Sequence, residues 1–352
     1  MFLGKLSWNK ARLDCFAVFV GAVLLERTVN LALLCLCSHR PGKPSSAYRR
    51  FQRFLSGFDL PLLDVGRFIL GVLPKPKEGF VLVMDRSLWQ LGSTPINVLF
   101  IGVVFGRMCF PIVWKALPHG GCSDVPARIS LLKNAVRVLD GTPIAALLMD
   151  REFGGKLRLE HLNNHAVGYV VRIKSNIWIG RRKAGCLAGR GRWKKHAGKR
   201  FEVCGQSVYF GAKSMTGQRA GRLLVISNHF GGADALAWYR LRWNIELSFG
   251  HLKSRGLNME ATHVSKPARI ERLCAVVAVA FVIAYRNGVR IEQKRAIQRK
   301  KHGYCAKSVF RAGLEQIISA LMRADVPLLR EMFCALKSPW PLPPAQLHFF
   351  VM

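Results

Sequence analysis

Acidic residues are scarce in this sequence. Its 352 residues include 54 Lys and Arg but only 20 Asp and Glu, which gives a formal net charge of +34. A chain this basic usually binds a polyanion, most often nucleic acid, because neutralising phosphates releases counterions. A membrane surface, a ribosome or an uninformative basic surface are weaker alternatives. The scarcity also makes any carboxylate inside an apolar run conspicuous, since an unpaired buried charge costs free energy.

Paired cysteines and long hydrophobic runs are also absent. The ten cysteines include no CxxC pair, which argues against a zinc framework or a secreted disulfide scaffold and favours free thiols in a reducing cytoplasm. The apolar stretches 15–25 and 273–285 are shorter than the roughly 20 residues that a membrane-spanning helix needs. Half of the residues are hydrophobic, enough for a large core and too many for wholesale disorder. We therefore expect a cytoplasmic protein with no membrane segment.

The start of the chain is predicted to be helical. Residues 13–36 are apolar nearly all round, which is typical of a buried helix. After a break rich in Pro, Gly and Ser, residues 48–55 mix aromatic residues with arginines at helical spacing. Arg49 and Arg50 are candidate DNA contacts there, although a solvated basic face over an apolar one explains the pattern equally well. Because a linker of prolines and lysines follows, we predict a small helical N-terminal DNA-binding domain over residues 1–74.

A run of strands comes next, and its strands are continuous apolar segments. Such strands indicate a sheet that is covered on both faces. The fold class is therefore predicted to be α/β. The expected strands are 80–84, 96–105, 108–114, 144–149 and 168–173, and the expected helices between them are 125–139 and about 155–164.

Residues 174–228 differ in character from the segments before them. They are rich in Gly, Arg and Lys and contain short alternating runs, which predicts a small antiparallel β insertion with basic loops. One loop combines cations with an indole, which suits contact with a DNA backbone and stacking on a base; a merely solvated loop is the alternative. The candidate DNA contacts in this loop are Arg192, Lys194 and Lys195.

Two long helices are predicted after the insertion, at about 234–254 and 269–286, followed by a basic, loosely helical tail. The chain after the N-terminal domain therefore divides into 75–173 as the first part of a core, 174–228 as the insertion, 229–290 as the rest of the core, and 291–352 as a tail of unknown role.

Two acids share one setting. Asp85 and Asp150 each end a predicted buried strand, and each is followed by an arginine. In an open α/β sheet, sites form at the ends of strands, and neighbouring parallel strands would bring these two carboxylates together. Two close carboxylates repel each other, and a divalent cation is the usual remedy. A strand-terminal cap is the alternative role for either acid.

The predicted helix at 234–254 supplies a third carboxylate, Glu246. At about 100° per residue, Tyr239, Arg242, Glu246 and Lys253 would lie on one stripe of that helix. The stripe would extend over roughly 20 Å, or several phosphate spacings of a nucleic-acid strand. A surface ion pair between Arg242 and Glu246 is the plainer explanation of the spacing.

These residues resemble a known family. The pattern Y-x2-R-x3-E-x6-K matches the YREK signature of DDE transposases from bacterial insertion sequences, the family numbered four among them. The block from Asp85 to Gly92 looks like that family's D-R-T-x-W-x-x-G, with Ser87 where Thr is common. The segment from Leu147 to Phe153 looks like its L-x-x-D-R-E-F, and the strand from Val170 to Lys174 resembles the one that follows. The resemblance covers about residues 45–290.

The resemblance implies an RNase H-like catalytic core with a β-rich insertion. It implies that Asp85, Asp150 and Glu246 hold two Mg²⁺ ions, with Mn²⁺ as a substitute, and that the enzyme cleaves transposon ends and joins them to target DNA. Tyr239, Arg242 and Lys253 would contact DNA phosphates near the cleaved end. The implied partner is double-stranded DNA, in the form of terminal inverted repeats and target, bound by a homodimer in the cytoplasm at the nucleoid.

Two other functions fit parts of the same pattern. Another RNase H-like nuclease, such as a resolvase, would share the acids but has no need of the YREK stripe. A non-catalytic basic DNA-binding protein from a decayed element would share the charge but has no need of the acids. Trp89 and Trp243 are expected to be buried core residues, with stacking on an unpaired base as the alternative for each.

Overall fold

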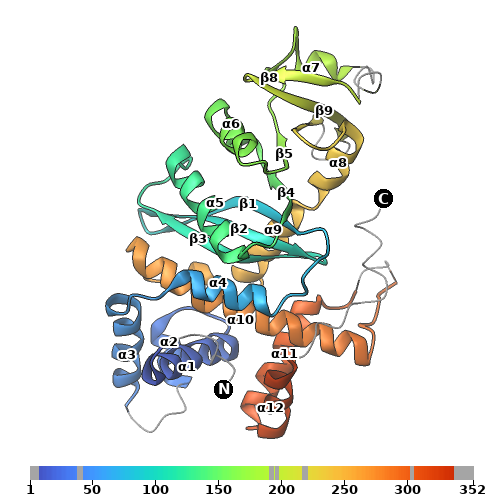
Figure 1. The fold of residues 1–352 in the computed structure, drawn as a ribbon. Coiled ribbons are helices and arrows are strands. Elements are labelled where there is room, and N and C mark those ends of the chain that lie inside the picture. The colour runs from blue at the N-terminus through green and yellow to red at the C-terminus, as the bar shows by residue number, and fades with distance from the viewer. Residues whose placement is uncertain are drawn as a thin grey trace.

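An eight-stranded sheet with the order β3-β2-β1-β4-β5-β10-β9-β8 lies at the centre of the chain (Figure 1). It is seen in a computed structural model that describes residues 8–37, 43–189, 194, 198–215, 221–301 and 305–336. The strands of this sheet are β1 (Phe80–Leu91), β2 (Thr94–Phe105), β3 (Met108–Leu117), β4 (Ile144–Met149), β5 (Tyr169–Arg172), β8 (Arg200–Val203), β9 (Gln206–Met215) and β10 (Gly221–Ser227). A separate hairpin consists of β6 (Trp178–Ile179) and β7 (Arg182–Lys183).

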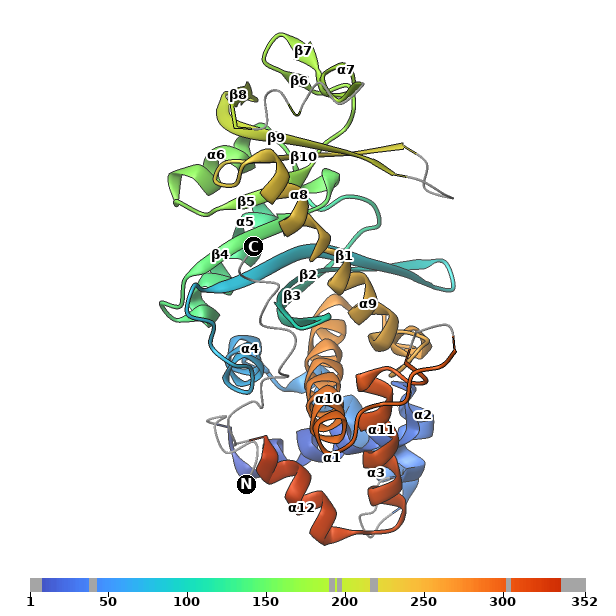
Figure 2. The same ribbon diagram turned by 90° about the vertical axis from the view of Figure 1, so that its right-hand side faces the viewer.

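The helices surround this sheet. They are α1 (Lys10–Glu26), α2 (Leu31–Leu34), α3 (Pro44–Gly57), α4 (Leu62–Gly71), α5 (Val125–Leu139), α6 (Lys156–Asn164), α7 (Ala184–Leu187), α8 (Gly232–Arg240), α9 (Trp243–Leu252), α10 (Pro267–Lys294), α11 (Val309–Met322) and α12 (Val326–Ala335). Helices α5 and α6 lie on one face of the sheet, and α8 and α9 lie on the other (Figure 2). The predicted α/β class and the two covered faces are confirmed.

The strand arrangement is that of an RNase H-like core. β2 and β3 form an antiparallel meander with β1, while β4 and β5 run parallel to β1. The predicted insertion is not a separate sheet, because β8, β9 and β10 continue the central sheet beyond β5. Covered on both faces, the central strands are almost wholly buried, as their continuous apolar sequences require.

The prediction that a strand ends at Asp85 is wrong. β1 continues through Asp85 to Leu91, because this second half pairs residue by residue with β2 across a tight turn at Gly92, whose φ is +58°. The parallel pairing of β1 with β4 does stop here, and its last pair is Met84 with Met149. Asp85 therefore lies where β1 leaves β4, and Asp150 directly follows the end of β4.

The predicted long helix at 234–254 is also wrong as a single element. The backbone N–H groups of Leu241 and Arg242 bond to carbonyls three residues back rather than four, and this tight turn separates α8 from α9. The predicted helix at 13–36 is likewise divided, since α1 ends at Glu26 and the next residue, Arg27, has a left-handed φ of 55°. The stripe along one continuous helix therefore does not exist, although its residues still meet, as described below.

The N-terminal helices pack against the C-terminal ones below the sheet (Figures 1 and 2). Arg272 of α10 donates to the Leu55 carbonyl of α3 at 2.8 Å. α10 and α11 approach so closely that a Cβ on Gly288 would come within 1.8 Å of the Val309 carbonyl oxygen. Of the helices that the structure describes, none has the length and apolarity to cross a membrane. The domain boundary at residue 74 stays a prediction.

Candidate active site

Asp85 and Asp150 lie side by side in the sheet with matching local geometry. Asp85 follows Met84, and Asp150 follows Met149. These two methionines form the last pair in the parallel register of β1 with β4. Each aspartate uses its Oδ1 atom to accept a hydrogen bond from the next backbone N–H, Arg86 or Arg151, at 2.8 Å in both cases. These bonds give both carboxylates the same contact to the following residue, within the shared sequence Met-Asp-Arg.

Arg242 joins Asp85 to Glu246. Its Nη1 donates to Asp85 Oδ2 at 3.0 Å, and its Nη2 donates to Glu246 Oε1 at 2.5 Å. The hydroxyl of Tyr239 donates to Asp150 Oδ1 at 3.1 Å. The tight turn between α8 and α9 thus directs Tyr239 and Arg242 at the acids of β1 and β4. All three predicted acids are brought together by these two residues.

The electrostatics reflect a concentration of negative charge in a basic protein. Burial raises the pKa of Asp85 to about 6, helped by the nearby Asp150 and Glu246 carboxylates and opposed by Arg242 and the Arg86 N–H. Burial lowers the pKa of Arg242, but Tyr239, Glu246 and Asp85 more than reverse that effect, so its pKa lies above the usual value. Two like charges close to one buried carboxylate favour binding of a cation.

The three carboxylates suit a hard divalent cation by their chemistry, because such ions prefer oxygen ligands. No group of three or more His, Cys, Asp or Glu side chains is arranged as a finished metal site in the described part of the chain. The Arg242 guanidinium binds one oxygen each of Asp85 and Glu246. Arg242 therefore competes with a metal for Asp85 Oδ2 and Glu246 Oε1.

Lys253 lies apart from the three acids. Its Nζ donates to the Leu88 carbonyl at 3.1 Å, pairs with Glu260 at 3.2 Å and lies 5.5 Å from the Trp89 ring centroid. Trp89 is only 6% exposed, so its expected core position is confirmed. Trp243 is 37% exposed, so its expected core position is wrong; it is the first residue of α9, after the unpredicted turn.

The remaining predicted DNA contacts lie elsewhere. Arg49 and Arg50 are on α3, whose apolar face is buried among the lower helices. Lys194 is exposed and lines a pocket of about 410 Å³ beside β9 and β10. Arg192 and Lys195 lie outside the described residues.

Three arginines at the site were not singled out from the sequence. Arg86 donates to both carboxylate oxygens of Glu152, at 2.8 and 2.7 Å. Arg128 donates to the Glu152 carbonyl at 3.0 Å, and Arg172 Nη1 lies 3.7 Å from Asp150 Oδ1. Arg86 directly follows Asp85, and Arg172 lies on the strand after Asp150, so both belong to the motifs of the sequence analysis. The sequence alone did not indicate their hydrogen-bond and ion-pair partners.

Two comparisons with known proteins gave a match. Residues 110–283 match the family model described as the transposase DDE domain. A cryo-EM structure of a piggyBac transposase synaptic complex with hairpin DNA is similar at 14% sequence identity, with a TM-score of 0.44, over 96% of this chain and 78% of that one. No curated protein matches the sequence. The chain is a DNA transposase, and the matched segment contains Asp150 and Glu246, with Asp85 before it.

Proposed function

We propose that Asp85, Asp150 and Glu246 are the catalytic carboxylates of a transposase of the bacterial insertion-sequence type, the family numbered four. The enzyme would cleave at transposon ends and join them to target DNA. The observation that carries this proposal is the meeting of three acids, from β1, β4 and α9, around Arg242 and Tyr239. The acids come from distant parts of the chain, as a functional site requires and a surface ion pair does not.

The same carboxylates would hold two Mg²⁺ ions, or Mn²⁺ in their place. When bound, such ions activate the attacking water or 3′-hydroxyl and stabilise the leaving oxygen of an in-line displacement. The chain's own part is to fix the ligands: the Arg86 and Arg151 N–H groups hold one oxygen of each Asp, which leaves Asp150 Oδ2 for ligation, and Asp85 Oδ2 as well once Arg242 releases it.

Tyr239 and Arg242 would bind the phosphate near the cleaved DNA end. A guanidinium can give two parallel hydrogen bonds to a phosphate, and an arriving phosphate would compete for the donors that now bind Asp85 and Glu246. Lys253, at the far end of α9 beside Leu88, would contact the strand further along. Arg49, Arg50, Arg192, Lys194 and Lys195 are proposed as further contacts to the DNA backbone.

The substrate would be double-stranded DNA, as terminal inverted repeats and as target, and the active form would be a homodimer acting at the nucleoid of the cytoplasm. Residues 1–74 would be a DNA-binding domain. The formal charge of +34 supports a polyanionic substrate. A resolvase-like nuclease would keep the acids but would not join a pre-cut end to a second DNA, so a strand-transfer assay separates the two functions.

The proposal is tested by Asp85→Asn, Asp150→Asn and Glu246→Gln, with Glu160→Gln on the exposed face of α6 as the matched control. Each of the first three variants is expected to lose cleavage of a plasmid that carries the transposon end, while binding to the end in a gel-shift assay persists. The control is expected to cleave like wild type. Wild-type cleavage in Mg²⁺ by any of the three would remove that residue from the site.

A further inference from the structure

The sheet edge that carries Asp150 also carries a row of cations. β4 and β5 run parallel, and β10 runs antiparallel to β5. The ends of β4 and β5 and the start of β10 therefore meet at one edge. Arg172 is the last residue of β5, Lys174 lies two residues further along the chain, and Arg222 lies at the start of β10. Along this edge, the negatively charged Asp150 is therefore followed by the positively charged Arg172, Lys174 and Arg222.

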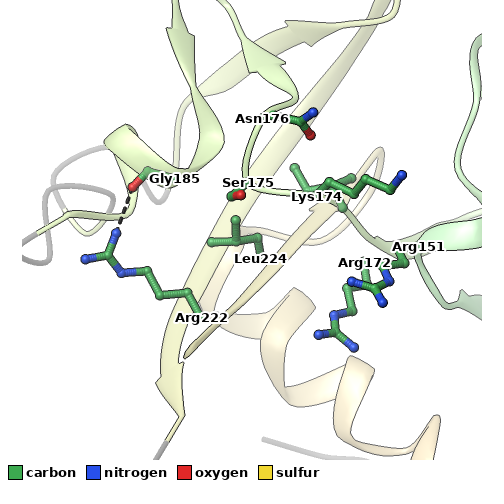
Figure 3. A pocket seen from close by; sticks show the side chains of 9 residues that line it. Arg151, Arg172, Lys174, Ser175, Asn176, Gly185, Arg222 and Leu224 are labelled. Atoms are coloured by element: carbon green, nitrogen blue, oxygen red, sulfur yellow. Dashed lines mark hydrogen bonds between the residues drawn. The ribbon is translucent and has the colours of Figure 1, made fainter. Parts of the chain in front are cut away.

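These cations line a pocket of about 600 Å³. Four of its nine lining residues are Arg or Lys and none is acidic. Figure 3 shows Arg222 on one side of the pocket, Arg151 and Arg172 on the other, and Leu224 between them. Arg222 is held in place, because its Nη1 donates to the Gly185 carbonyl at 2.8 Å. The pocket combines an apolar strand surface with a cationic rim.

Such a lining suits the sugar–phosphate backbone of a DNA strand. Lys174, Arg151 and Arg222 are exposed side chains that can reach phosphates, and Arg172 pairs with Asp150 at 3.7 Å, so the row begins at a candidate catalytic carboxylate. A small anion would need fewer charges and less room than this pocket provides. A strand bound here would lead directly to the acids.

Joining requires two DNA molecules at the same acids. The 3′-hydroxyl oxygen of the transposon end forms a bond to a target phosphorus, the bond from that phosphorus to the target's own 3′ oxygen breaks, and the proton lost by the attacking hydroxyl balances the one taken up by the leaving oxygen. The number of phosphodiester bonds stays the same. Tyr239 and Arg242 approach the acids from the α8–α9 turn, whereas the cationic pocket extends away from Asp150 along β5 and β10.

We propose that this pocket binds the phosphates of the target strand during joining. The inference rests on the proposed function, since it presumes that the transposon end occupies Tyr239 and Arg242. Its failure can be told apart from failure of that function, because end cleavage needs no target DNA. The donor DNA that flanks the transposon is the other source of a strand at this edge, and it is present only before cleavage.

The test uses the double variant Lys174→Gln, Arg222→Gln in the full chain, with Arg330→Gln on α12, at the opposite end of the molecule (Figure 1), as the matched control. Cleavage is measured on a plasmid with intact transposon ends. Joining is measured with pre-cut ends and a supercoiled target plasmid over a range of target concentrations. The double variant is expected to need at least about tenfold more target for half-maximal joining, and to lose far more joining than cleavage.

Salt dependence gives a second readout on the same proteins. Complexes with pre-cut ends are titrated with labelled target duplex at several salt concentrations. Loss of two phosphate contacts should make the slope of log affinity against log salt shallower by about 2. Equal losses of cleavage and joining would assign the pocket to the end or its flank and overturn the proposal, and so would an unchanged target requirement. Far-UV circular dichroism and the unfolding temperature of the variant establish that it is folded.

Discussion

Arg86 and Glu152 connect β1 to the segment after β4 just beyond the point where backbone pairing between the two strands stops. Arg86 Nε donates to both carboxylate oxygens of Glu152, at 2.8 and 2.7 Å, and the last backbone pair is Met84 with Met149. Asp85 lies between that pair and Arg86. The spacing of Asp85 and Asp150 is therefore set on one side by the sheet and on the other by this ion pair.

Further hydrogen bonds fix the same pair. Arg86 Nη1 donates to the Gly121 carbonyl at 3.0 Å, and Asn97 of β2 donates to that same carbonyl at 2.9 Å. Arg128 of α5 holds the Glu152 backbone. The pair is thus a positioning device for both aspartates: its side chains bond to each other and to the Gly121 carbonyl, while the Arg86 backbone N–H holds Asp85 Oδ1.

Breaking this pair should weaken the site without removing its ligands. Arg86→Lys keeps the charge but cannot reproduce the planar fork, and Glu152→Gln removes the charge. Each is expected to raise the Mg²⁺ concentration needed for half-maximal end cleavage by about 10- to 100-fold, the usual effect of losing a residue that orients metal ligands. Saturating Mg²⁺ should restore part of the rate. The measurement is a metal titration of cleavage.

The exposed pair Arg67–Asp64 on α4 supplies the control, because Arg67→Lys makes the same chemical change far from the acids. Its metal requirement is expected to equal that of wild type. If Arg86→Lys lowered the cleavage rate with no change in metal requirement, the pair would have a role other than positioning the ligands.

Arg242 occupies two of the oxygens that a metal would use, so its removal should make the acids bind metal more tightly in the absence of DNA. In Arg242→Ala, the repulsion between Asp85 and Glu246 is no longer compensated, and Mg²⁺ becomes the available cation. A ligand that binds only the folded state stabilises it by mass action. The rise in unfolding temperature on adding Mg²⁺ is therefore expected to be larger for Arg242→Ala than for wild type.

The same variant should bind the transposon end more weakly and cleave it more slowly. Arg240→Ala, an exposed arginine two residues away, is the control and should behave like wild type in all three measurements. A Mg²⁺-induced shift in unfolding temperature no larger than that of wild type would show that Arg242 does not compete with metal for these carboxylates.

Much of the fold was predictable because its signals are local. The helix at 125–139 has the predicted bounds: Asp124 caps its first turn by accepting from the Ala127 N–H, and Asp140 ends it with a left-handed φ of 47°. The closeness of Asp85 to Asp150 was predictable for a related reason, since two apolar strands of similar pattern pair in parallel and carry their following acids to one edge.

What could not be predicted depends on distant partners. No glycine or proline lies near the break between α8 and α9, so the local sequence favours one helix; the observed turn lets Arg242 reach Asp85, 157 residues away in sequence. The extension of β1 past Asp85 likewise comes from pairing with β2. Lys253 has the spacing of the signature but pairs with Glu260, a contact that spacing alone does not reveal.

His251 offers a test of the core below the site. Its ring packs against Phe310, with centroids 4.6 Å apart and ring planes inclined by 34°, and its Nδ1 is buried with no hydrogen-bond partner among the described residues. Burial, with a smaller contribution from Arg255, lowers the pKa of His251 to about 4. The unfolded chain, with an ordinary histidine pKa, binds a proton more readily than the folded one between about pH 6.5 and 4. Acid therefore favours unfolding over that window.

His251→Phe keeps the aromatic contact and removes the titration. The wild-type free energy of unfolding is expected to fall by up to about 3 kcal/mol more than that of the variant as the pH is lowered from 7.5 towards 4. The comparison is made by urea unfolding at steps of pH, with His119→Phe at an exposed position as the control. Parallel curves for wild type and His251→Phe would mean that the ring is protonated in the folded protein as readily as in the unfolded one, and hence that α9 does not pack on Phe310 as tightly as the ring contact indicates.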